Sequence, residues 1–263
     1  MIISFWRVNM HCVVRRYGRV LTSRLCRTFS SMTSKPNRPF TVVVEGNIGS
    51  GKTTFLNQFK RMPEVIALAE PVEMWRDANG HNLLDLMYED PSKYSMAFQS
   101  YVQLTMLEMH QANFDVPIKV MERSIHSARH CFVENLYNSG FLASVNRAVL
   151  DEWYKWICNT QDVNADLIVY LYTTPETAFE RIQHRNRNEE KKISMSYLKT
   201  LHDLHEHFIR SGLTKRFCKA PVIEIDANKD LSELSAKFDE CRERIMKSSV
   251  NNDNQLLELE TLQ

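Results

Sequence analysis

The stretch EGNIGSGKTT at residues 45–54 contains the spacing G-x-x-x-x-G-K-T, in which two glycines are followed by Lys52 and Thr53. A loop of this kind, between a strand and a helix, cradles phosphates because its backbone N–H groups and the helix N-terminus point at the anion. The lysine would reach the β- and γ-phosphates, and the threonine hydroxyl would hold Mg²⁺. The motif predicts a nucleoside triphosphate site formed by Gly46, Asn47, Ile48, Gly49, Ser50, Gly51, Lys52, Thr53 and Thr54.

Two further groups of charged residues could act on a bound triphosphate. Glu70, in EPVEMW, could take the proton from an attacking hydroxyl group. In KVMERS, Glu122 could complete the Mg²⁺ shell and Arg123 could bind a phosphate or the acceptor oxygen. Taken singly, an exposed glutamate or an adjacent Glu-Arg pair is also typical of a charged surface, so the order of the motifs has to decide.

A third group, Arg181, Arg185 and Arg187, could bind a phosphoryl group in transfer, since arginine forks match its oxygens. By charge alone, a solvated helix end explains these arginines better. A phosphate-binding loop also occurs in GTPases, and DANG at 77–80 fits their D-x-x-G motif. However, NKDL at 228–231 has leucine where N-K-x-D requires the base-reading aspartate. We therefore favour a kinase.

Short apolar runs that alternate with longer helical stretches must position these residues. Strands are predicted at 41–45, 65–69, 117–121, 166–172 and 221–225. Helices are predicted from 52, over 91–112, from 124, over 144–158, from 175, over 195–210 and from 231. This alternation is typical of an α/β fold with a central parallel sheet flanked by helices, in which ligands bind at the carboxyl ends of the strands.

Residues 1–38 form a basic leader that contains no acidic residue. Together with its Ser and Thr content, this composition is typical of a mitochondrial transit peptide, and RTFS at 27–30 resembles a matrix-processing site. Met32 could start a shorter form that stays in the cytosol or nucleus. We predict a folded domain over 39–247 and a mobile tail over 248–263, because the tail begins with the polar run SSVNNDN.

Composition excludes several other classes of function. The chain has 263 residues and a net charge of +1, but residues 45–263 hold 25 basic and 32 acidic residues, a net charge of −7. Such a domain is a poor nucleic-acid binder, and no apolar run is long enough to span a membrane. The six cysteines have no metal-binding spacing. His202, His205 and His207 lack the companion ligands of a zinc site.

The motifs together, in the order phosphate-binding loop, E-P-V-E-x-W, E-R-S and R-x-x-x-R-x-R, resemble the deoxyribonucleoside kinase family. The resemblance runs from about residue 39 to about residue 226. The stretches NLLDLMY at 82–88 and FQSYV at 98–102 make it greatest for the insect multisubstrate branch, followed by the mitochondrial thymidine kinases. The resemblance implies a P-loop kinase fold and transfer of the ATP γ-phosphate, with Mg²⁺, to the 5′-hydroxyl of deoxyribonucleosides.

The same resemblance implies a role for each matching residue. Glu70 resembles the base that deprotonates the 5′-hydroxyl, and Arg123 its neighbour at that oxygen. The arginines at 181, 185 and 187 resemble a lid over the donor phosphates. Tyr88 and Glu190 resemble the pair that holds the 3′-hydroxyl in this family, Phe132 the ring that stacks on the base, and Gln99 the residue that reads the base. The full set of other expected substrate-binding residues is Trp75, Met87, Tyr88, Phe98, Gln99, Val102, Met106, Ala128, Phe132 and Glu190.

The chemistry of Gln99 fits a broad choice of base. Its amide carries a donor and an acceptor in either order, and thymine and cytosine present opposite patterns at N3 and the 4-position. Val102, Met106 and Ala128 would surround the 5-position and leave room for a methyl group, where deoxycytidine kinases have an Arg and an Asp. Ordinary helix packing explains Val102 and Met106 equally well.

The resemblance further implies a homodimer paired through helices and feedback inhibition by dTTP. A nucleoside monophosphate kinase is one alternative, but it would need a second phosphate subsite in place of sugar contacts. A relative without activity, serving as a subunit of a larger complex, is another. That alternative predicts loss of Lys52, Thr53, Glu70 or Arg123, and all four are present.

Overall fold

The computed structural model describes residues 38–187, 189–212, 214 and 220–250. The predicted leader, apart from its last residue, and the tail from 251 onwards lie outside the described residues, so their boundaries stay predictions. The last helix, α12 (Leu231–Val250), continues past the expected end of the domain at 247.

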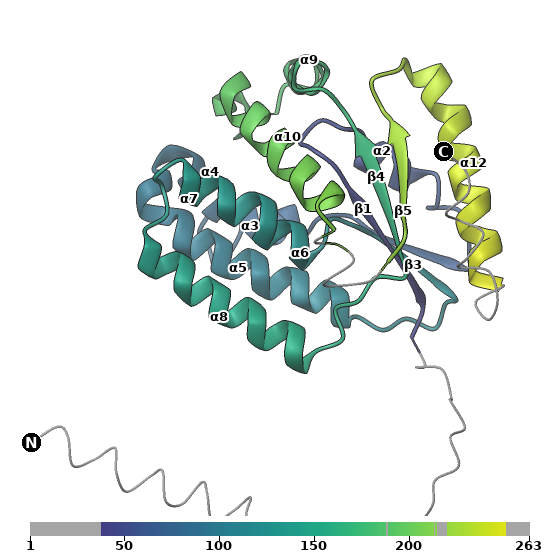
Figure 1. The fold of residues 1–263 in the computed structure, drawn as a ribbon, viewed down its shortest axis with the longest axis horizontal. Helices are drawn as coiled ribbons and strands as arrows, with labels where there is room; N and C mark the ends of the chain where they lie inside the picture. Colours follow the sequence, from purple (N-terminus) through teal and green to yellow (C-terminus); the bar gives the residue numbers. More distant parts are fainter. Residues whose placement is uncertain (1–37, 188, 213, 215–219, 251–263) are drawn as a thin grey trace, which may run out of the picture. The chain divides into compact units, whose positions relative to one another are not determined.

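A single five-stranded sheet forms the centre of the described domain (Figure 1). Its strands pair in parallel in the order β2-β3-β1-β4-β5, which confirms the predicted parallel sheet. Each strand lies within one residue of its predicted bounds. The strands are β1 (Phe40–Glu45), β2 (Val65–Leu68), β3 (Ile118–Glu122), β4 (Leu167–Tyr172) and β5 (Val222–Asp226).

Helices cover both faces of the sheet because successive strand residues point to opposite sides. In β1, Val42 and Val44 join one apolar cluster with α2 (Lys52–Asn57) and α12, whereas Val43 joins a second cluster on the other face. That second face is covered by α5 (Pro91–Gln111), α8 (Ser144–Thr160) and α10 (Met195–Arg210), as Figure 1 shows.

The remaining helices are short and lie around the carboxyl end of the sheet. Asp90 caps α5 and Thr174 caps α9, each accepting a hydrogen bond from a backbone N–H of the first turn, and a proline follows each cap. The short helices are α3 (Val72–Arg76), α4 (Leu83–Glu89), α6 (Ile125–Ser127), α7 (Glu134–Asn138), α9 (Pro175–Arg185), a π-helix (Ala128–Val133) and a 3₁₀ helix (Glu189–Lys192).

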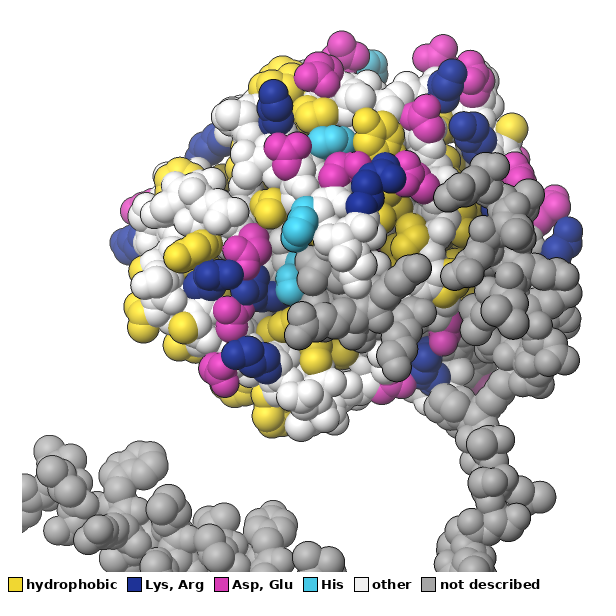
Figure 2. Space-filling view, in the orientation of Figure 1, with side chains coloured by type: hydrophobic (Ala, Val, Ile, Leu, Met, Phe, Trp, Pro, Cys, Tyr) yellow, Lys and Arg dark blue, Asp and Glu magenta, His cyan; other side chains and the backbone are white. Residues whose placement is uncertain are grey.

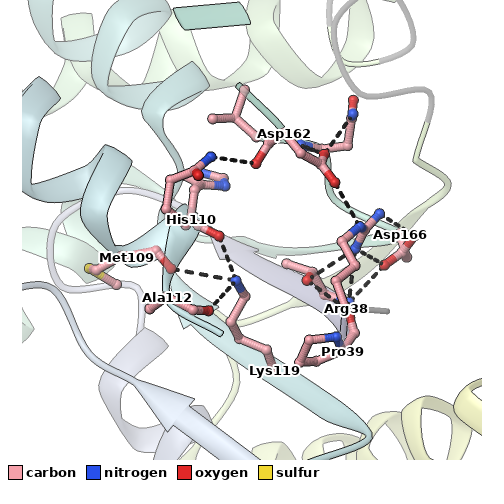
Figure 3. Close-up of polar contacts among 12 residues, drawn as sticks. Arg38, Pro39, Met109, His110, Ala112, Lys119, Asp162 and Asp166 are labelled. Carbon is pink, nitrogen blue, oxygen red and sulfur yellow. Dashed lines mark hydrogen bonds and ion pairs between the residues drawn. The ribbon is translucent and has the colours of Figure 1, made fainter. Parts of the chain in front are cut away.

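The far end of α5 is fixed by a buried lysine of β3 (Figure 3). Lys119 Nζ donates to the carbonyl oxygens of His110 at 2.7 Å and Ala112 at 3.2 Å, where the helix leaves its last carbonyls without helical partners. Beside it, Arg38 donates to both carboxylate oxygens of Asp166, at 2.7 and 3.0 Å, at the start of β4. These contacts tie the start of the domain and the end of α5 to the sheet.

Candidate active site

The phosphate-binding loop connects β1 to α2 and needs glycine at two points of close approach. A Cβ on Gly46 would lie 2.7 Å from the carbonyl oxygen of Leu171, and one on Gly49 would lie 2.6 Å from that of Ala178. Both residues also have positive φ, +146° and +81°, which disfavours other side chains. The loop is thus held tightly between the ends of β4 and α9.

The loop brings together the residues predicted to hold phosphate and metal. Lys52 Nζ is buried and donates to the carbonyl oxygens of Gly46 at 3.2 Å and Asn47 at 2.8 Å. Burial, together with the nearby positive Arg123, lowers the pKa of Lys52 to about 8.

Thr53 Oγ1 lies 3.1 Å from a carboxylate oxygen of Glu122, at the end of β3. A hydroxyl and a carboxylate are the hard oxygen ligands that Mg²⁺ prefers, so this pair fits the ion implied by the fold family.

The guanidinium of Arg123 lies at the centre of the site. Its Nε forms an ion pair with Glu70 Oε1 at 2.9 Å, and its Nη1 donates to the carbonyl oxygen of Gly46 at 2.9 Å. The ring of Phe132 lies 4.5 Å from its central carbon, a cation–π contact. Burial raises the pKa of Glu70, and the charge of Arg123 opposes this rise. The ion pair lies at the edge of a pocket.

This pocket, hereafter the acceptor pocket, lies at the carboxyl end of the sheet between β3, α3, α4 and α5. It contains every residue predicted to bind the acceptor, although the sequence positions range from 70 to 190. The predicted residues that line it are Glu70, Trp75, Met87, Tyr88, Phe98, Gln99, Val102, Met106, Arg123, Ala128, Phe132 and Glu190.

The deep end of the acceptor pocket is built by aromatic packing and by an amide. Trp75 Nε1 donates to Thr105 Oγ1 at 2.9 Å, and the Trp75 and Phe98 rings pack edge to face with centroids 5.7 Å apart. Gln99 is buried, and within the described part of the chain its Oε1 has no hydrogen-bond partner. A buried acceptor without a partner is costly unless a ligand supplies a donor.

A second pocket, hereafter the donor pocket, adjoins the first at the loop. Both pockets are lined by Gly49, Lys52, Thr53, Glu122 and Arg185. Thr54 and Arg181 line the donor pocket, whereas Ile48 and Arg187 line the acceptor pocket. The loop residues Gly46, Asn47 and Ser50 are buried and line neither of these two pockets. Asn47 Nδ2 donates to the carbonyl oxygen of Leu198.

The arginines of the predicted lid reach across to the acceptor side. Arg185 donates to both carboxylate oxygens of Glu190, at 3.0 and 2.5 Å, and Arg187 lies 3.6 Å from the same carboxylate. Arg181, in the second half of α9, donates to the carbonyl oxygen of Lys229 and so links this helix to the loop after β5. The lid arginines therefore connect Glu190 with the edge of the donor pocket.

Sequence reasoning missed several lining residues because nothing in their local sequence marks them. Tyr197 of α10 lines the acceptor pocket, and the loop at 228–230 lines the donor pocket. Glu45 is fully buried and accepts a hydrogen bond from Ser124 Oγ at 2.6 Å. Only the position of Glu45, directly before the phosphate-binding loop, could have drawn attention to it. The missed pocket residues are Val72, Arg76, Leu84, Ser124, Leu136, Thr177, Glu180, His184, Tyr197, Asn228, Lys229, Asp230, Leu234 and Phe238.

Comparison with known proteins identifies the class to which this fold and site belong. The deoxynucleoside kinase family model matches residues 42–252, most of the described domain. The chain therefore belongs to the deoxynucleoside kinase family, which confirms the resemblance, the fold class and the prediction of an ATP-dependent kinase.

The chain is 47% identical over 205 residues to the mitochondrial thymidine kinase 2 of Homo sapiens, covering 78% of this chain and 77% of that protein. It is 32% identical over 239 residues to the deoxycytidine kinase of Homo sapiens, covering 80% and 92%. It is 31% identical over 229 residues to the mitochondrial deoxyguanosine kinase of Xenopus laevis, covering 77% and 86%.

Proposed function

We propose that this protein transfers the γ-phosphoryl group of ATP to the 5′-hydroxyl of thymidine, deoxycytidine and purine deoxynucleosides in nucleotide salvage. The observation that carries the proposal is the junction of the donor and acceptor pockets at Lys52, Thr53 and Glu122. A triphosphate on the loop and a nucleoside in the acceptor pocket would meet there, beside Glu70 and Arg123.

In this mechanism Glu70 takes the proton of the 5′-hydroxyl as that oxygen attacks the γ-phosphorus. The bond from the γ-phosphorus to the oxygen that bridges it to the β-phosphate breaks, and ADP leaves. The base must be ionised to do so, and the ion pair with Arg123 favours the ionised form against the effect of burial. Mg²⁺, held by Thr53 and Glu122, would neutralise charge on the donor phosphates. Lys52 and the lid arginines Arg181, Arg185 and Arg187 would stabilise the charge that develops during transfer.

The acceptor pocket supports a nucleoside as the second substrate. The unpaired Oε1 of Gln99 is suited to a donor on the base edge, and Phe132, next to Arg123, offers a ring face for stacking. Tyr88 and Glu190 line the same pocket at the sugar end. The relatives named above act, by their names, on thymidine, deoxycytidine and deoxyguanosine, which favours a deoxyribonucleoside.

Incubation of the full-length protein with ATP, Mg²⁺ and each of the four deoxynucleosides tests the proposal. We expect monophosphates from thymidine and deoxycytidine, and slower formation from the purine deoxynucleosides. Thymidine monophosphate serves as the contrasting acceptor. Phosphorylation of thymidine monophosphate without phosphorylation of thymidine would instead make the protein a nucleoside monophosphate kinase.

The joined pockets also support feedback inhibition by dTTP. Its base and sugar can occupy the acceptor pocket while its phosphates extend to the loop at Lys52, so that it would exclude both substrates. Inhibition should therefore be competitive with thymidine and relieved by excess ATP. A dTTP effect that is independent of the thymidine concentration would exclude this mode.

Mitochondrial localisation and dimerisation complete the proposal. The basic, acid-free composition of residues 1–38 and the mitochondrial relatives favour import into the matrix. A reporter carrying residues 1–38 should enter mitochondria, with processing near Ser30, and a diffuse cytosolic signal would favour a start at Met32. A homodimer is supported by exposed apolar side chains on α8, in particular Val145, Trp153 and Trp156.

A further inference from the structure

A fully buried histidine of α10 lies directly behind Arg123. The Nε2 atom of His205 is 3.2 Å from Nη1 of Arg123, and its Nδ1 atom is 2.7 Å from the carbonyl oxygen of Leu201. A carbonyl oxygen only accepts, so Nδ1 carries the proton and Nε2 presents a lone pair. The neutral imidazole therefore accepts a hydrogen bond from the guanidinium.

Electrostatics favours the same state of the ring. Burial lowers the pKa of His205 well below its ordinary value, and the adjacent charge of Arg123 lowers it further. A protonated ring would place a second buried cation against the guanidinium. The charge state and the hydrogen-bond geometry thus agree.

Arg123 needs external support because its backbone is strained. Its φ is +62°, a left-handed conformation that a residue with a long side chain rarely adopts. Its Nε is paired with Glu70, and its Nη1 lies between two acceptors, the Gly46 carbonyl oxygen and His205 Nε2. These two acceptors fix the plane of the guanidinium and hence the direction in which Nε meets Glu70.

The helix that carries His205 also supports the phosphate-binding loop. The carbonyl oxygen of Leu198, two turns earlier on α10, accepts a hydrogen bond from Asn47 at 3.0 Å. The chain reaches α10 directly from the lid segment that contains Arg187 and Glu190. One helix therefore contacts both the loop and Arg123.

We propose that His205 is a positioning residue for Arg123, whose neutral Nε2 accepts from Nη1 and orients the guanidinium toward Glu70 and the acceptor 5′-oxygen. The inference rests on the proposed function, since that function gives Arg123 its place beside the reacting oxygen. His205 acts through Arg123 and does not itself touch the substrate.

Two substitutions separate the contacts of His205. In His205→Asn, the amide nitrogen lies near the position of Nδ1 and keeps the bond to Leu201, but the acceptor toward Arg123 is lost. In His205→Gln, the longer side chain places an amide oxygen near the position of Nε2. His207→Asn, on the exposed face of the same helix, is the matched control.

We expect His205→Asn to lower kcat for thymidine by about tenfold to a hundredfold, because misplacement of a group that meets the reacting atoms has effects of this size. KM for thymidine should change less than kcat. His205→Gln should recover a large part of the loss, and His207→Asn should match the wild type. Wild-type kcat in a folded His205→Asn variant, or equal losses in the Asn and Gln variants, would overturn the inference.

A double-mutant cycle with Arg123→Lys tests whether His205 acts through the arginine. Lysine has no Nη1, so His205→Asn should cost little further activity in that background, giving a large coupling energy. Additive losses would overturn the inference. If the Asn variant does not fold, the same cycle with the apolar His205→Met decides. Thymidine phosphorylation by the wild type tests the proposed function separately. A failure of the proposed function can therefore be told apart from a failure of the inference about His205.

Discussion

The buried ion pair of Glu70 and Arg123 contributes both to stability and to the proposed chemistry. The pair neutralises two charges that would be costly to bury singly, and the charge of Arg123 favours the ionised carboxylate that a base requires, against the effect of burial. The hydrogen bond from Arg123 to the Gly46 carbonyl links this pair to the phosphate-binding loop. A change at either residue should therefore affect chemistry more than nucleoside binding.

Replacing Glu70 tests its role as the base. Glu70→Gln keeps the shape of the side chain but cannot take a proton, so kcat should fall by roughly 10²–10⁴. Binding of thymidine, measured by calorimetry, should stay close to that of the wild type. The control is Glu73→Gln, because the Glu73 side chain is exposed and pairs only with Arg76 among the contacts of the described residues. Near-wild-type turnover in Glu70→Gln would remove this residue from the base role.

Glu45 should make stability depend on pH. Burial raises the pKa of its carboxyl from 4.5 to about 7, although the hydrogen bond from Ser124 and the charge of Arg123 oppose the rise. The folded chain thus keeps a proton that the unfolded chain loses. The stabilising contribution is fully present below pH 4.5 and is lost as pH rises through about 7.

Glu45→Gln cannot ionise, so its free energy of unfolding relative to the wild type should rise with pH by up to about 1.4 kcal/mol per pH unit in this window. Denaturant unfolding of both proteins between pH 5 and about 8 measures the difference. The buried histidines titrate in both proteins and cancel. A difference that is constant with pH would show that Glu45 does not titrate there.

At the scale of the elements, sequence patterns located the strands, the long helices and the starts of α2, α6 and α9, but not α3, α4 or α7. Buried parallel strands are continuous apolar runs, and α5 and α9 begin with a cap and a proline, so both kinds of signal are local. Helices α3 and α4 are too short to show a helical period. The sequence did not predict the π-helix after Ser127, which contacts both α5 and α10.

Some residues of the candidate site could likewise be predicted from local sequence, and others could not. Glu70, Lys52 and Arg123 stand in motifs next to strand ends, so their convergence at one edge of a parallel sheet was predictable. Tyr197 and His205 are ordinary residues of an amphipathic helix until the fold brings α10 over the loop. The connection of Arg185 to Glu190 likewise depends on how the lid segment turns back.

We expect the side chains where α5 packs against the π-helix to determine which nucleoside bases the pocket accepts. Val102 and Met106 of α5 and Ala128 of the π-helix are buried and line the acceptor pocket. Met106→Arg with Ala128→Asp should install an ion pair that occupies the space of a 5-methyl group. We expect thymidine to lose more kcat/KM than deoxycytidine, by on the order of 1–3 kcal/mol.

Met106→Arg alone should impair both substrates more strongly, because its buried charge has no partner. Both nucleosides measured on wild type, single and double variants complete the comparison. Equal losses for the two nucleosides in the double variant would mean that these residues serve the core alone and that specificity is set elsewhere.

At the scale of the whole molecule, the face shown in Figure 2 is mixed in charge. On the face shown in Figure 2, Lys and Arg side chains are interspersed with Asp and Glu, which offers no continuous basic stripe for nucleic acid on that face. None of the described helices has an apolar stretch long enough to cross a membrane. What stands out are large apolar side chains on α8.

These side chains follow a helical spacing. Val145, Val149, Trp153 and Trp156 lie three or four residues apart and so share one face of α8, and their exposed fractions are 66, 42, 56 and 50%. Leu104 of α5, the helix packed beside α8, is 50% exposed. Contiguous exposed apolar surface of this kind marks an interaction site, and a second copy of the chain paired through these helices would cover it.

Charged substitutions on this face should therefore separate the proposed dimer. The wild type should sediment at twice the 30.8 kDa of one chain, and Trp153→Glu with Trp156→Glu should sediment as a monomer. Both indoles are half exposed, so the fold itself should lose little, about 0.5 kcal/mol or less per site. Lys155→Gln, which lies off this face of the same helix, should leave the dimer intact. A wild type that stays monomeric at micromolar concentration, or a double variant that stays dimeric, would contradict pairing through α8.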